Sequence, residues 1–160
     1  MVRFGIGFDV HPLVVGRKLI LGGIQIKYGK GLAGHSDADV ACHAIADALL
    51  GAAGLGDIGM MFPDSDPQNK DISSLKILEQ IIHRLAENQF AVVNVDVTVV
   101  AQQPRIAPFV QAMRDRIASA LNISAENINI KGKSTEQLGF IGRQEGIAAL
   151  AVASITKNEL

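Results

Sequence analysis

The amino-acid sequence predicts an α/β (α+β) fold, a mixed β-sheet with helices covering one face and a short β-hairpin beside it. Residues 2–11 alternate apolar side chains with polar residues or glycine, which is typical of a strand with two different faces. Residues 90–101 alternate valines with polar residues in the same way. Three further segments have apolar residues at helical spacing. Strands and helices in this order favour one sheet with helices on a single side.

Composition limits the class of protein. The chain has 160 residues, of which 48% are hydrophobic, so we expect one domain over residues 1–160. The net charge of -1 offers no broad basic field, which argues against nucleic acid as a partner. The single cysteine cannot form an internal disulfide, no charged and apolar leader precedes the first strand, and no apolar run is long enough for a membrane span. We therefore expect a cytoplasmic protein that binds neither nucleic acid nor membrane.

Residues 34–54 predict the helix around which the rest of the chain is organised. Its alanines and leucines favour helix, and Asp37 or Ser36 is expected to cap its start. Gly54 can end it in the left-handed conformation that glycine adopts at little cost. The start of this helix attracts anions, so His35 and Ser36 are either anion contacts or residues that merely begin the helix.

A candidate metal site joins this helix to the first strand. Asp39, His43 and Asp47 follow one another at intervals of four residues and share one stripe of the helix. Asp9 and His11 lie two residues apart and share one face of the strand. Asp9, His11 and His43 together are three ligands that zinc prefers, and three protein ligands with an open fourth position are typical of catalytic zinc.

The alternative is that these residues are ordinary polar side chains. A lone histidine on a helix is usually hydrogen-bonded, and Asp-x-His is common at strand ends. The combination of the two motifs, together with the absence of a cysteine framework, favours metal.

The remaining segments complete the predicted fold. Two short apolar runs about Gly22 and Gly23 predict a hairpin over 18–27, and residues 30–35 read as a loop. A helix is predicted from Asp71 or Ser73 to Asn88, with His83 on its surface. The later elements are a strand over 90–101, a helix over 106–121, a strand over 127–131 and a buried closing strand over 146–156.

Three loops carry residues that suit a polar ligand, although each has a simpler explanation. The loop 56–66 holds aspartates that are either solvated or able to bind sugar hydroxyls or a hard cation. Arg105, beside Pro104, is either a solvated charge or a phosphate contact. Residues 133–136 form either a capped turn or a set of donors for phosphate with one ligand for magnesium.

Read together, these motifs resemble the 2-C-methyl-D-erythritol 2,4-cyclodiphosphate synthase family. The resemblance runs in order along nearly the whole chain. It is carried by His43 and by the motifs GFDVH (7–11), HSDADV (35–40), GDIG (56–59), FPDSDP (62–67), NVDVTVVAQQPR (94–105) and STEQLGF (134–140).

The resemblance implies an enzyme of the non-mevalonate isoprenoid pathway, with residues 1–160 as a single catalytic domain. The family converts 4-diphosphocytidyl-2-C-methyl-D-erythritol 2-phosphate to the 2,4-cyclodiphosphate and CMP. It also implies a homotrimer packed through the sheets with active sites shared between subunits, one Zn²⁺ per subunit, and a second divalent cation, Mg²⁺ or Mn²⁺.

Carried over residue by residue, the family's zinc ligands fall on Asp9, His11 and His43, and its second cation falls on Glu136. His35 and Ser134 match positions that steady the transition state. One departure is Lys133, which stands in a run where the family often has threonine, and this change puts the affinity for phosphate in doubt. The substrate contacts implied are Ser36, Asp57, Ile58, Gly59, Phe62, Pro63, Asp64, Ser65, Asp66, Ala101, Gln102, Gln103, Pro104, Arg105, Ile106, Ala107, Lys133, Thr135, Phe140 and Arg143.

Two other functions remain open at this point. A zinc-dependent phosphoesterase would use the same ligands with an activated water. A non-enzymatic binder of isoprenoid diphosphates would show no turnover.

Overall fold

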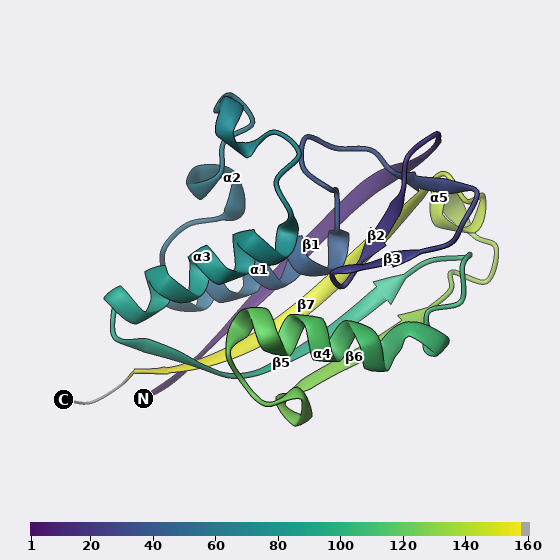
Figure 1. Ribbon diagram of the computed structural model, residues 1–160. Helices are drawn as coiled ribbons and strands as arrows, with labels where there is room; N and C mark the ends of the chain where they lie inside the picture. The colour runs from purple at the N-terminus through teal and green to yellow at the C-terminus, as the bar shows by residue number, and fades with distance from the viewer. Residues whose placement is uncertain (158–160) are drawn as a thin grey trace.

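The computed structural model describes residues 1–157 and shows a five-stranded mixed sheet with the strand order β4-β1-β7-β5-β6 (Figure 1). A separate two-stranded hairpin pairs β2 with β3. The strands are β1 (Val2–Val15), β2 (Leu19–Leu21), β3 (Ile24–Ile26), β4 (Lys30–Leu32), β5 (Phe90–Val100), β6 (Ile128–Lys133) and β7 (Gly146–Lys157). The helices are α1 (Val40–Ala53), α2 (Ile58–Met61), α3 (Ser74–Glu87), α4 (Val110–Leu121) and α5 (Gly139–Gly142), with 3₁₀ turns at Pro67–Asn69, Ala107–Phe109 and Ala125–Asn127.

The last strand lies in the middle of the sheet. β7 pairs antiparallel with β1 on one side and with β5 on the other, while β5 and β6 run parallel. Its alanines 149, 151 and 153 are buried against the helices. Small side chains at this position let helix and sheet backbones approach closely, so the predicted buried closing strand is confirmed.

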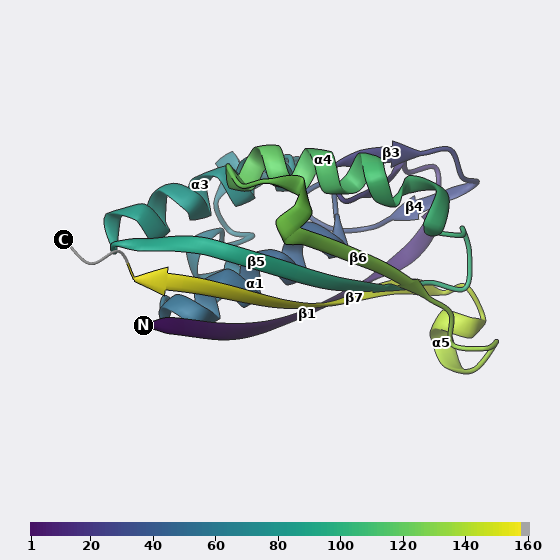
Figure 2. The same ribbon diagram turned by 90° about the horizontal axis from the view of Figure 1, so that it is seen from below.

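Helices α1, α3 and α4 cover one face of the sheet (Figure 2). The covered face of β1 carries Gly5 and Gly7, and a Cβ added at either would lie 1.9 Å from a backbone oxygen of α1, that of Ala48 or Ala44. Only glycine permits this approach. The glycines therefore bring α1, with His43, against the strand that carries Asp9 and His11.

The opposite face of the sheet is largely bare of helices (Figure 2), and it carries exposed apolar side chains. Phe4, Ile6 and Phe8 on β1 are 72%, 67% and 57% exposed, and Leu150 and Val152 on β7 continue the patch. Large contiguous apolar patches on a protein surface usually mark an interaction site.

Several local predictions were wrong. Asp39, and not Asp37 or Ser36, caps α1, because its carboxylate accepts hydrogen bonds from Cys42 N and from the hairpin turn at Gly22 N and Gly23 N. Short elements were missed in segments read as loops: β4 within 30–35, α2 within 56–66, and α5 after 133–136. Each is three or four residues long, too short to show a hydrophobic period.

Other boundaries agree with the sequence. Gly54 ends α1 with a φ of 73°, and Asn88 ends α3. Ser73 occupies the cap position of α3 but its side chain makes no capping hydrogen bond. In the described part of the chain, no helix is both long and apolar enough to cross a membrane.

Candidate metal centre and active site

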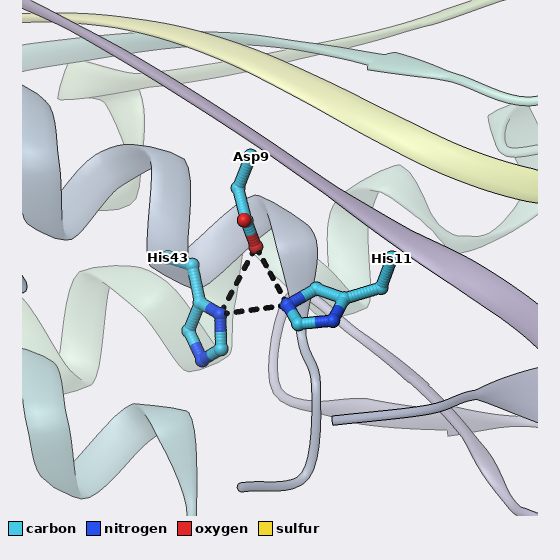
Figure 3. Close-up of side chains that lie close together, drawn as sticks. All are labelled: Asp9, His11 and His43. Carbon is cyan, nitrogen blue, oxygen red and sulfur yellow. Dashed lines mark hydrogen bonds and ion pairs between the residues drawn. The ribbon is translucent and has the colours of Figure 1, made fainter. Parts of the chain in front are cut away.

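Asp9, His11 and His43 converge on one point, as the sequence spacing predicts (Figure 3). Asp9 Oδ2 lies 3.0 Å from His11 Nε2 and 3.0 Å from His43 Nδ1, and the two nitrogens lie 3.4 Å apart. Among residues 1–157, this is the group of His, Cys, Asp and Glu side chains whose spacing suits a metal ion.

The spacing of the three donor atoms fits a divalent metal. Tetrahedral zinc with bonds of about 2.0–2.1 Å places its ligand atoms roughly 3.3 Å apart. The measured separations of 3.0, 3.0 and 3.4 Å are close to this value. One carboxylate and two imidazoles form a donor set that suits zinc, and other first-row divalent ions also bind such sets.

The tautomer of His11 agrees with this arrangement. His11 Nδ1 lies 2.8 Å from the backbone oxygen of Ala33. A carbonyl only accepts, so Nδ1 carries the proton and Nε2 presents a lone pair to the triad. Gly34 lies against the ring, where a Cβ would be 2.9 Å from its Cε1, and so leaves no room for a larger residue.

The electrostatics of the triad favour positive charge at its centre. Burial alone would raise the pKa of Asp9, but hydrogen bonds from His11 and His43 in their protonated form hold that pKa well below its ordinary value. The hydrogen bond with Asp9 raises the pKa of His11. Both shifts are in the direction expected where a carboxylate favours a neighbouring positive charge.

A cavity of about 300 Å³ opens beside the triad, and we call it the triad cavity. His35 lines this cavity, and its Nε2 is buried without a hydrogen-bond partner among the described residues. A histidine that lines a ligand-sized cavity and has an unpartnered nitrogen is a candidate for contact with a bound ligand. The lining residues are His11, Gly34, His35, Ser36, His43, Ile58, Gly59, Phe62, Asp64, Asn69, Ile72 and Ile77.

The loop that forms the rim of this cavity is anchored to α1. Asp47, one turn beyond His43, accepts a hydrogen bond of 2.8 Å from Ile58 N. Asp57 caps α2 through Met60 N, and Asp66 caps the following 3₁₀ turn through Gln68 N. These backbone contacts hold part of the acidic loop in place, while Pro63, Asp64 and Ser65 remain exposed.

A second pocket, of about 390 Å³, holds the predicted contacts of the segments 101–107 and 133–134. It is lined by Ala101, Gln102, Gln103, Pro104, Arg105, Ile106, Ala107, Gly132, Lys133 and Ser134. Within residues 1–157, it shares no lining residue with the triad cavity. The structure of one chain therefore divides most of the predicted site residues between two separate places. The predicted contacts that line neither are Asp57, Pro63, Ser65 and Asp66 in the rim loop, and Thr135, Glu136, Phe140 and Arg143 after β6.

The chain after β6 borders the second pocket. Glu136 is exposed, and its carboxylate accepts a hydrogen bond of 2.9 Å from Ser134 Oγ. Thr135 Oγ1 donates to Leu138 O. Phe140 lines a different hollow with Val10, His11, Pro12, Glu145 and Gly146, and Arg143 forms an exposed ion pair of 2.8 Å with Glu145.

Sequence reasoning missed residues that support the triad. Ser74 contacts His43 from the start of α3, and no local pattern signals this contact because it spans two helices. The sequence places Asp47 in the polar stripe of α1. Its hydrogen bond with Ile58 N could not be predicted, because that bond depends on the fold of the loop. Asn69, Ile72 and Ile77 also line the triad cavity.

The fold and this site define a class of protein, a mixed-sheet α+β domain with a metal-ligand triad that opens to a small-molecule cavity. A model of the YgbB family matches residues 2–156, so the chain belongs to the YgbB family. It is 56% identical over 155 residues to the 2-C-methyl-D-erythritol 2,4-cyclodiphosphate synthase of Caldicellulosiruptor bescii, covering 97% of this chain and 99% of that protein. The synthase of Carboxydothermus hydrogenoformans is 53% identical, with 97% and 95% covered.

Solved structures agree in fold. IspF of Plasmodium falciparum in complex with CDP superposes with a TM-score of 0.87 at 32% identity, covering 99% of this chain and 97% of that one. The bifunctional IspDF of Campylobacter jejuni gives a TM-score of 0.95 at 43% identity. That match covers 99% of this chain and 43% of the bifunctional protein.

Proposed function

We propose that the triad cavity is the catalytic centre at which this member of the YgbB family forms a cyclic diphosphate. The chain is an enzyme with cyclodiphosphate synthase function in isoprenoid biosynthesis, since its relatives with that name align over nearly its whole length. The observation that carries the assignment of the site is the convergence of Asp9, His11 and His43 on one point beside a ligand-sized cavity.

The reaction is an intramolecular phosphoryl transfer. An oxygen of the substrate's 2-phosphate forms a bond to the cytidine-distal phosphorus of the diphosphate, and the bond from that phosphorus to the bridging oxygen breaks. CMP leaves with the electron pair. The attacking phosphate is already ionised at neutral pH, so no strong general base is required, and positioning together with charge neutralisation is the main task.

Residues of the triad cavity hold the reacting end of the substrate. His35 and Ser36 line the cavity, and the unpartnered Nε2 of His35 is the proposed partner of a phosphate or sugar oxygen in the substrate complex. The loop with Asp57, Ile58, Gly59 and the segment 62–66 surrounds the erythritol part. Bound divalent ions, Zn²⁺ on the triad and Mg²⁺ or Mn²⁺ on Glu136, supply positive charge that offsets the repulsion between the two phosphate groups.

The second pocket holds the cytidine end. The segment Ala101 to Ala107 offers backbone donors and acceptors for a base, while Arg105, Lys133, Ser134 and Thr135 offer groups for phosphate oxygens. Solved IspF structures bound to CDP support a nucleotide as the ligand. Glu136 lies outside the metal-ligand triad and would hold the second divalent cation, which would supply positive charge near the phosphates.

The two pockets suggest a shared site in a homotrimer. The bare face of the sheet is apolar enough to bury against other copies, and a cyclic assembly would bring the triad cavity of one subunit toward the second pocket of its neighbour. Helix α5, which includes Phe140, lies at one end of the sheet (Figure 2). We propose residues 1–160 as one catalytic domain of such a trimer.

Phosphorus NMR of the purified protein with the cytidyl substrate tests the function. The expected products are CMP and a cyclic diphosphate, formed without incorporation of oxygen from ¹⁸O-labelled water. Hydrolysis with ¹⁸O incorporation would instead indicate a zinc-dependent phosphoesterase. An unchanged substrate spectrum in the presence of Zn²⁺ and Mg²⁺ would indicate a binder without turnover.

A further inference from the structure

The ring nitrogen of His43 that faces away from the triad has its own set of partners. In Figure 3 this nitrogen, Nε2, points away from Asp9 and His11. Ser74 Oγ lies 2.9 Å from it and Ser36 Oγ lies 3.1 Å from it. His43 is 8% exposed and Ser74 is fully buried, so solvent competes little for these contacts.

The single proton of the Ser74 hydroxyl is already used. Ser74 Oγ makes a short hydrogen bond to Asp37 Oδ1, and Ser74 N donates to Asp37 Oδ2 at 2.9 Å. Carboxylate oxygens accept hydrogen bonds, so Ser74 Oγ must donate to Asp37. The hydroxyl then has only lone pairs left for His43, and Nε2 must carry the proton that joins them.

These successive hydrogen bonds from His43 to Ser74 and from Ser74 to Asp37 fix the tautomer of His43. With the proton on Nε2, a neutral imidazole has its lone pair on Nδ1, the atom that faces Asp9 and His11. Ser36 does not settle the tautomer. Its oxygen accepts from Ala38 N at 3.1 Å, but its own proton is free to point toward or away from His43.

We infer that Ser74 and Asp37 are positioning residues that hold His43 with Nδ1 ready to bind the metal. The inference rests on the proposed role of His43 as a metal ligand and extends it to two residues that neither belong to the triad nor line its cavity. Hydrogen-bond partners of this kind orient a ligating histidine and increase its basicity, and their loss typically costs 10- to 100-fold in metal affinity.

The competing explanation is that Asp37 only anchors the start of α3. Asp37 accepts from Ser74 N in the place where the cap residue Ser73 makes no such bond. Ser74→Ala separates the two roles because it removes the hydroxyl and keeps the backbone donor to Asp37. Ser73→Ala is the matched control, since it alters the neighbouring serine at the same helix start.

The test is the zinc dissociation constant of the full-length protein, measured by competition with a chromophoric chelator at a pH near 7.5. We expect Ser74→Ala and Asp37→Asn to bind zinc about 10- to 100-fold more weakly than the parent. Ser73→Ala and the conservative Ser74→Thr should remain close to the parent. Thermal unfolding of each zinc-free variant confirms that it is folded at the temperature of the measurement.

A second measurement uses ¹H–¹⁵N spectra of zinc-loaded protein with labelled histidine. The Nε2 proton of His43 should exchange slowly in the parent and much faster in Ser74→Ala. Parent-like zinc affinity in both Ser74→Ala and Asp37→Asn would overturn the inference while leaving the metal site intact, provided that His43→Ala loses zinc. Retention of stoichiometric zinc by His43→Ala would overturn the metal site itself, and the inference with it. If Ser74→Ala does not fold, Asp37→Asn decides alone.

Discussion

The triad cavity and the second pocket differ in how their polar groups are supported. In the triad, each histidine has a fixed partner for its second ring nitrogen, Ala33 O for His11 and Ser74 Oγ for His43. Beside the second pocket, Ser134 and Glu136 are exposed and bond mainly to each other. Glu136 also holds a φ of 52°, a conformation that non-glycine residues seldom adopt.

This difference indicates which part of the proposed site one chain completes by itself. We expect a preorganised triad to bind metal without help from a neighbour, because burial and hydrogen bonds have already oriented its side chains. We expect an exposed carboxylate with one local partner to act only when substrate, cation or another subunit approaches. The first region should therefore be self-sufficient, and the second should depend on other groups.

The largest effect is expected for His43→Ala. Removing one of three ligands should abolish stoichiometric zinc binding and lower the rate of CMP release by about 100- to 1000-fold. Metal analysis after gel filtration and a CMP assay measure the two effects. His83→Ala, on the exposed face of α3, is the control and should keep both properties. Full zinc content in His43→Ala would show that the ligand set is wrong.

Asp39→Ala should mainly affect stability. Asp39 is fully buried and accepts from three backbone groups, Gly22 N, Gly23 N and Cys42 N. Leaving these donors unpaired should cost about 3 kcal/mol or more. For a chain of this size, the corresponding fall in the melting temperature is about 6–12 °C. A calorimetric scan that shows an unchanged melting temperature would mean that the hairpin and α1 are held by other contacts.

Asp39 also shows where prediction from sequence reaches its limit. The alternation in β1 and the four-residue spacing in α1 were enough to bring Asp9, His11 and His43 together, because strand and helix periods fix side-chain direction. The cap of α1 could not be assigned, since two of its three contacts come from a turn 16 and 17 residues earlier. Ser74 has no local signature for the same reason.

The short elements and the arrangement of the two pockets could not be predicted from the sequence, for physical reasons. β4 and α5 gain their stability from neighbours, β4 by pairing with β1, so their own residues carry no period. The roles of Ser134 and Glu136 were drawn from family resemblance, and one chain does not place them beside the triad cavity. That part of the site stays a prediction.

Ligand binding should protect the loop Asp64 to Asp71 from hydrogen exchange. Most of its residues are exposed, and its internal bonds are those of a single 3₁₀ turn, so local opening should be easy. With CDP and a divalent cation, we expect its amides to exchange about 10-fold more slowly. Helix α4, which lines neither pocket, provides the unchanged reference within the same sample. Equal exchange of the loop with and without CDP would count against a role in ligand binding.

The smallest effect is expected from Asp47→Asn. Burial raises the pKa of Asp47, so the folded state holds this proton more tightly than the unfolded state. The parent should therefore lose stability relative to the variant as pH rises from the ordinary carboxyl range through the raised pKa, and the difference should become constant above it. Urea unfolding with zinc chelated, over about pH 4 to 7, measures this difference. A difference in unfolding free energy between parent and variant that does not change with pH would contradict the raised pKa of Asp47.

The most direct test of the account concerns the division of the site between subunits. His43→Ala damages only the triad cavity of its own chain, and Glu136→Ala damages only the group beside the second pocket. Each variant alone should be nearly inactive. In a trimer reassembled from both, some interfaces pair an intact triad with an intact Glu136, so CMP release should recover well above that of either parent variant. The variants are unfolded and refolded together, and native mass spectrometry confirms the mixed trimers. Mixed trimers with no recovery of CMP release would contradict the shared site.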